Sequence, residues 1–75
     1  MEEVKLSITE FFILKQILLN EGHTLLIKDI AAATHLTYQT VSRHVNKFVN
    51  QGDIQREGKK FTIVNPYFRE AVANG

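Results

Sequence analysis

The chain contains no cysteine, a single proline and no long apolar run. The lack of cysteine excludes disulfides, thiolate metal ligands and thiol nucleophiles. The longest apolar stretch, FFIL at residues 11–14, is far shorter than the roughly 20 residues of a membrane-spanning helix. The opening MEEVKLS carries two glutamates where a secretory signal carries basic residues. We therefore expect a cytoplasmic protein with no membrane partner.

The chain is short, and its formal net charge is only +1. Its 75 residues, 44% of them hydrophobic and 23% charged, predict one soluble domain over residues 1–75. A core of that size leaves little stability for an elaborate active site. The charge is unevenly distributed: residues 1–22 hold two lysines against four glutamates, whereas residues 23–75 hold seven basic residues against four acidic ones. A polyanion would therefore meet the second part of the chain.

The first half of the chain shows the signals of two helices. Ser7 followed by Glu10 has the spacing of a capping box, which predicts a first helix over about residues 8–20, with Gly22 beyond its end. The segment HTLLI at residues 23–27 is apolar and partly β-branched, and it predicts a short extended stretch. A second helix, KDIAAAT at residues 28–34, follows it.

A third helix is predicted from about Tyr38 to Asn50, with Thr37 as its N-cap and Gly52 as its stop. Val41, Val45 and Phe48 recur within it at helical spacing and predict a buried stripe.

The hydrophobic period then changes from helical to alternating. Ile54, Phe61 and Ile63 alternate with polar residues on either side of EGKK, which predicts a hairpin with Gly58 in its turn. Asn65 followed by Pro66 then predicts the start of a fourth helix. The predicted order is helix, short strand, helix, helix, hairpin and helix.

This order and the segment IAAATHLTYQTVSRHVNKFVNQGDI resemble the winged helix-turn-helix family of bacterial and archaeal DNA-binding regulators. A frequent pattern in that family is LAxxxGLSxxTVSR, followed by an apolar helix and GxI. The matching positions are Ile30, Ala31, Leu36, Thr37, the TVSR of residues 40–43, Gly52 and Ile54. The resemblance spans about residues 24–64 and implies an α+β fold, with a three-helix core, a short β-hairpin wing and a C-terminal helix.

His35 departs from the family pattern, because it stands where glycine is frequent in the turn between the two helices. Glycine enters the left-handed backbone region at little cost, but histidine also enters it more readily than most residues. We therefore expect a strained or slightly reshaped turn within the same fold.

The third helix carries the candidate recognition surface. At about 100° per residue, Gln39, Arg43, Asn46 and Lys47 lie opposite the apolar stripe. Arginine pairs bidentately with guanine, and glutamine or asparagine with adenine, whereas threonine, serine and lysine suit phosphate oxygens. With the basic residues of the wing, the predicted DNA-binding residues are Thr37, Tyr38, Gln39, Thr40, Ser42, Arg43, Asn46, Lys47, Arg56, Lys59 and Lys60.

Simpler roles exist for the same residues. A polar, basic helix face is most often only solvated. Tyr38 lies near the edge of the stripe, where packing against the second helix competes with base contact. Lys59 and Lys60 have the alternative role of solubilising an edge strand.

No residue pattern points to catalysis or to a cofactor. The histidines, His23, His35 and His44, lack the helical spacing of a zinc pair. Phosphate-cradling glycine loops, paired carboxylates and nucleophile motifs are also missing from the sequence. We expect a non-enzymatic protein with no metal, no cofactor and no small-molecule ligand, since the DNA-binding fold itself occupies the whole chain.

The first helix is apolar around nearly its whole circumference, which is more than one small core buries. We predict a homodimer in which Ile13 and Ile17 face the partner and Phe11 and Leu18 face the core. The alternative is that the fourth helix and the N-terminal residues cover the surplus. The predicted function is sequence-specific binding of double-stranded DNA by a small transcriptional regulator. The alternatives are a DNA-binding replication or plasmid-maintenance factor and a winged-helix module that binds protein.

Overall fold

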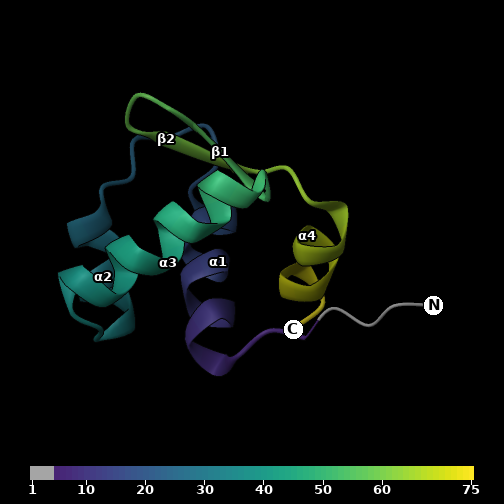
Figure 1. Cartoon of the computed structure of the whole chain (residues 1–75), viewed down its shortest axis with the longest axis horizontal. Coiled ribbons are helices and arrows are strands. Elements are labelled where there is room, and N and C mark those ends of the chain that lie inside the picture. The colour runs from purple at the N-terminus through teal and green to yellow at the C-terminus, as the bar shows by residue number, and fades with distance from the viewer. Residues whose placement is uncertain (1–4) are drawn as a thin grey trace.

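The structure, a computed structural model, describes residues 5–75 and shows four helices and one antiparallel hairpin in that range (Figure 1). The elements are α1 (Ile8–Leu19), α2 (Ile27–Thr34), α3 (Tyr38–Gln51), β1 (Ile54–Glu57), β2 (Lys60–Ile63) and α4 (Pro66–Ala73). In Figure 1, α3 crosses in front of α1, the hairpin closes one end, and α4 lies at the side opposite α2. The predicted winged helix-turn-helix fold is confirmed.

Helices α1, α3 and α4 begin where the sequence places their caps, whereas α2 begins at Ile27, one residue earlier than predicted. At the start of α1, the Ser7 hydroxyl accepts from the Glu10 N–H at 3.1 Å and the Glu10 carboxylate accepts from the Ser7 N–H at 3.0 Å. Thr37 caps α3 by accepting from the Thr40 N–H at 3.1 Å, and Asn65 caps α4 in the same way. Each cap occupies backbone donors that have no partner inside the helix.

The turn between α2 and α3 uses a left-handed residue, as the position of His35 predicts. His35 has φ 59° and ψ 28°, and it is the one non-glycine residue with a positive φ in the described range. The next residue, Leu36, donates its N–H to the Ala31 carbonyl at 3.1 Å, which closes the end of α2. A turn that glycine makes freely is therefore made here at the cost of some backbone strain.

The hairpin pairs Ile54 with Ile63 and Glu57 with Lys60, with Gly58 at φ 60° in the turn. The expected short strand before α2 is wrong, because the two strands of the hairpin make up the whole described sheet. The extended stretch forms one backbone hydrogen bond with the hairpin, from the Leu25 N–H to the Lys59 carbonyl at 2.8 Å. One bond does not make a ladder, so the wing has only two strands.

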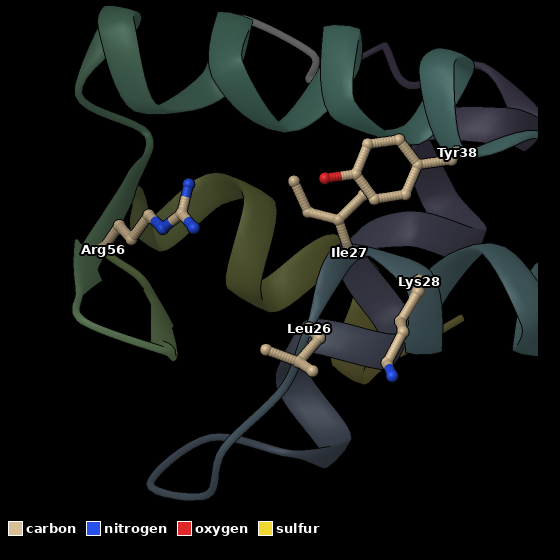
Figure 2. A pocket seen from close by; sticks show the side chains of 5 residues that line it. All are labelled: Leu26, Ile27, Lys28, Tyr38 and Arg56. Atoms are coloured by element: carbon tan, nitrogen blue, oxygen red, sulfur yellow. The ribbon is translucent and has the colours of Figure 1, made fainter.

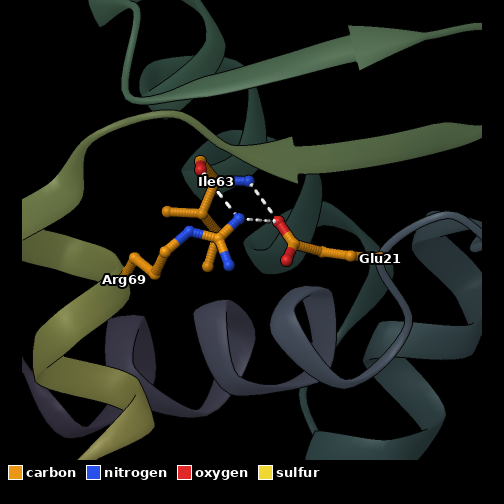
Figure 3. A network of polar contacts seen from close by, with 3 residues as sticks. All are labelled: Glu21, Ile63 and Arg69. Carbon is orange, nitrogen blue, oxygen red and sulfur yellow. Dashed lines mark hydrogen bonds and ion pairs between the residues drawn. The ribbon is translucent and has the colours of Figure 1, made fainter.

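Side chains secure the free edge of β2 (Figure 3). The Glu21 carboxylate accepts from the Ile63 N–H at 2.9 Å and also from the Arg69 guanidinium. Arg69 in turn donates to the Ile63 carbonyl at 3.2 Å. The carboxylate and the guanidinium occupy backbone groups of Ile63 that a third strand would use, and they tie the turn after α1 to β2 and α4.

The core lies between α1, α2, α3, α4 and the hairpin, and it corrects the prediction about α1. Ile13 and Ile17 are 0% exposed and belong to this core, so the prediction that they face a partner subunit is wrong. Phe11 and Leu18 are half-buried and pack against the core, as predicted. The exposed apolar side chains of α1 are instead Ile8 at 74%, Phe12 at 49% and Leu19 at 65%.

Candidate nucleic-acid interface

The outward face of α3 is polar and basic, and its inward face is apolar. Val41 and Val45 are completely buried, and Phe48 is 1% exposed. On the opposite side of the helix, Gln39 and Arg43 are exposed. The predicted orientation of α3 is therefore confirmed, because the buried stripe turns the other face outward.

The predicted DNA-binding residues all lie at the surface of the protein. Two are half-buried, Thr40 and Ser42, and the others are exposed: Thr37, Tyr38, Gln39, Arg43, Asn46, Lys47, Arg56, Lys59 and Lys60. The Thr37 hydroxyl donates to Thr40 Oγ1 at 2.8 Å and accepts from the Thr40 N–H. Since Thr40 Oγ1 is the acceptor, its own proton remains available to a phosphate oxygen.

Lys47 lies on the flank of α3 that faces α1. Its Nζ is 3.9 Å from Glu10 Oε2, and its side chain is 55% exposed. Burial alone would raise the pKa of Glu10, but its hydrogen bonds to Ser7 and the charges of Lys47 and His44 hold that pKa below its usual range. The ionised Glu10 therefore offsets part of the positive charge of Lys47.

The wing presents three cationic side chains. Lys59 lies in the turn and Lys60 begins β2, both exposed. On β1, Arg56 places its guanidinium carbon 5.3 Å from the centre of the Phe61 ring and donates from Nε to the Gly58 carbonyl at 3.3 Å. These contacts orient the Arg56 side chain over the Phe61 ring.

A hollow of about 200 Å³ separates the wing from the start of α3 (Figure 2). Its lining comes from three elements and consists of Leu26, Ile27, Lys28, Tyr38 and Arg56. Figure 2 shows the Tyr38 hydroxyl pointing toward the side where Arg56 lies, with Ile27 between them, while the Lys28 ammonium points away. The structure thus brings together Tyr38 and Arg56, which are far apart in the sequence.

No pattern in the sequence marks the three lining residues at the start of α2. Leu26 and Ile27 are aliphatic residues with no sign of function, and the one available signal was the charge of Lys28 in the first turn. Tyr38 is 58% exposed and also lies against this part of α2, so it both packs and remains accessible.

Within residues 5–75, no group of three or more histidine and acidic side chains is placed to bind a metal ion. No helix in that range is long and apolar enough to cross a bilayer.

The comparison with protein families gives one match. The model described as MarR family matches residues 5–59, which is more than half of the chain. The matched segment runs from just before α1 to the turn of the wing, so it includes the helix-turn-helix and the whole outward face of α3. No curated protein and no solved structure matches the chain.

Proposed function

Because the chain belongs to the MarR family of DNA-binding transcriptional regulators, we propose that it binds specific DNA sequences in the cytoplasm, with α3 in the major groove. Proteins of this family bind double-stranded DNA and are not enzymes. The observation that carries the proposal is the outward face of α3, where Gln39, Arg43 and Asn46 are exposed opposite the core. These three side chain types discriminate bases by bidentate hydrogen bonds.

Within this proposal, the residues of α3 divide into two groups. Arg43 suits guanine, and Gln39 and Asn46 suit adenine. Thr40, which keeps a free hydroxyl proton, and Lys47, which is shared with Glu10, suit phosphate oxygens instead. Base contacts would thus come from the middle of the face, with backbone contacts on its flanks.

The test of the proposed function is selection of bound duplexes from a random pool. We expect an enriched consensus, because the exposed face of α3 carries side chains that distinguish base pairs. Binding without any enriched sequence would contradict specificity. Failure to bind any duplex would favour the alternative of a winged-helix module that binds protein.

The wing should contribute affinity without specificity. Replacing both Lys59 and Lys60 by alanine should weaken binding to every duplex and lower the slope of log K against log salt by about 2, because each lysine would neutralise one phosphate. The consensus should not change. The matched control is Lys5→Ala, an exposed lysine that precedes α1. An unchanged slope in the double variant would show that the wing turn stands clear of DNA.

We also propose that the protein forms a homodimer, as family members typically do. The stripe formed by Ile8, Phe12 and Leu19 supports this proposal, because its members fall on one side of α1 and are exposed. At 100° per residue, this stripe lies opposite Glu10, whose carboxylate contacts Lys47 of α3. A partner bound to the stripe would therefore leave α3 free to bind DNA.

A further inference from the structure

We propose that the hollow between Tyr38, Ile27 and Arg56 binds one phosphate of the DNA backbone. The recognition helix and the wing would then hold the same strand at a single point. The inference rests on the proposed function, in which α3 occupies the major groove. It adds a backbone site that Tyr38 and Arg56 form jointly, in place of separate roles for the two residues.

The position of the hollow suits a strand of the duplex. The major and minor grooves of B-DNA are separated by a sugar-phosphate backbone, so an element in one groove and an element over the next have a strand between them. The hollow lies between the start of α3 and strand β1 of the wing (Figure 2). A DNA backbone that passes between the start of α3 and β1 would therefore lie over this hollow.

The chemistry of the lining suits a phosphodiester and its sugar. The Nε of Arg56 already donates to the Gly58 carbonyl, so its terminal N–H groups remain for phosphate oxygens. Within the described part of the chain, Arg56 has no carboxylate partner. The Tyr38 hydroxyl supplies a neutral donor from the other wall, and Ile27 supplies an apolar surface for the deoxyribose.

The size of the hollow argues against a separate small-molecule site. At about 200 Å³ it is smaller than the roughly 300–1,000 Å³ of most small-molecule pockets. At the start of α2, the Leu26 N–H does not contribute to such a site, because it already donates to Asp29 Oδ2 at 3.0 Å. The lining side-chain donors on either side of Ile27 are the Tyr38 hydroxyl and the Arg56 guanidinium, whereas the Lys28 ammonium points away (Figure 2).

The direct test replaces single phosphates of the selected duplex by neutral methylphosphonates. At one position, we expect the replacement to weaken binding of the unaltered protein about tenfold or more, because it removes a charge-assisted contact. In the variants Arg56→Met and Tyr38→Phe, the methylphosphonate at that same position should weaken binding much less than it does in the unaltered protein. Arg56→Met keeps an aliphatic stem over Phe61, and Tyr38→Phe keeps the ring, so both should fold normally. Lys60→Ala, a wing variant outside the hollow, should keep the full sensitivity.

A double-mutant cycle provides the second measurement. If the two side chains share a phosphate, their effects on affinity should not be independent. The affinity loss of the double variant Tyr38→Phe with Arg56→Met should then be smaller than the product of the two single losses by a factor of about three or more. The consensus should be the same in all variants. Independent losses, sensitivity at two different phosphates, or a changed consensus for Tyr38→Phe would each overturn the proposal.

Two further outcomes separate this inference from its alternatives. If the unaltered protein binds no duplex, the proposed function falls together with the site. If it binds duplex but no phosphate shows the shared loss, the site alone is wrong. Inorganic phosphate should compete no better than chloride at equal ionic strength. Stronger competition that is lost in Arg56→Met would assign the hollow to a free anion and overturn the assignment to DNA.

Discussion

Arg43→Ala should weaken binding to the selected duplex by about 1–3 kcal/mol, or roughly 5- to 150-fold, and relax the base preference at one position. The reason is geometric. Arg43 is exposed on α3, opposite the side where Val41 and Val45 enter the core. A guanidinium at that place can donate two parallel hydrogen bonds to the O6 and N7 of one guanine. The measurement is a titration of the consensus duplex and of duplexes with each base changed.

Arg43→Lys is the matched control, because it keeps the charge and loses the bidentate fork. We expect the lysine variant to retain most of its affinity for random duplex while losing preference at the same base. Equal losses on every sequence would show that Arg43 contacts phosphate. No loss in either variant would remove α3 from the interface and contradict the proposed mode of binding.

The parts of the fold that sequence analysis predicted correctly depend on local signals. Ser7 with Glu10, and Thr37 before α3, predict helix starts because a cap needs only a few consecutive residues. His35 was placed in a turn by its position in a motif, and its left-handed backbone confirms that prediction. The outward face of α3 was equally accessible, since apolar and polar residues alternate along it with a clear helical period.

Local sequence signals do not predict features that form where several helices and strands pack together. The hollow joins the start of α2, the start of α3 and β1, and no spacing in the sequence relates Ile27 to Arg56. The ion pair between Glu10 and Lys47 likewise depends on how α1 crosses α3. The expected short strand failed for a similar reason, because pairing depends on a neighbour and Leu25 reaches the hairpin through one bond only.

The orientation of α1 was mispredicted because the helix has apolar residues on every side. Periodicity selects a buried face only when polar residues mark the opposite one. In α1 the choice is made by the surroundings: Ile13 and Ile17 enter a core shared with α2, α3, α4 and the hairpin, and Lys15 donates to the Val72 carbonyl of α4 at 3.0 Å. The remaining side, with Phe12 and Leu19, is left exposed.

Ile13→Glu should unfold the protein, whereas an Ile13 side chain that faced a partner subunit would allow a folded monomer. Ile13 is 0% exposed. Losing the buried side chain costs about 2–5 kcal/mol, and an unpaired carboxylate in the core adds several kcal/mol more. A domain of this size has a total stability of only about 4–11 kcal/mol, at roughly 0.05–0.15 kcal/mol per residue. Circular dichroism should show loss of helix at 25 °C, and a cooperative thermal transition in this variant would contradict the buried position.

The matched control is Ile8→Glu, the same substitution in the same helix at a side chain that is 74% exposed. It should keep the native spectrum, because an acidic residue in the first turn also suits the helix dipole.

Phe12→Glu, at the centre of the exposed stripe, then tests the proposed homodimer separately from folding. Sedimentation should show the unaltered protein as a dimer and Phe12→Glu as a folded monomer, since a charge on each subunit would lie in an apolar interface. A dimer that survives Phe12→Glu would assign the contact to another surface. The dimer would be refuted if the unaltered protein sediments as a monomer at about 100 μM, because that concentration is far above a dissociation constant near 1 μM.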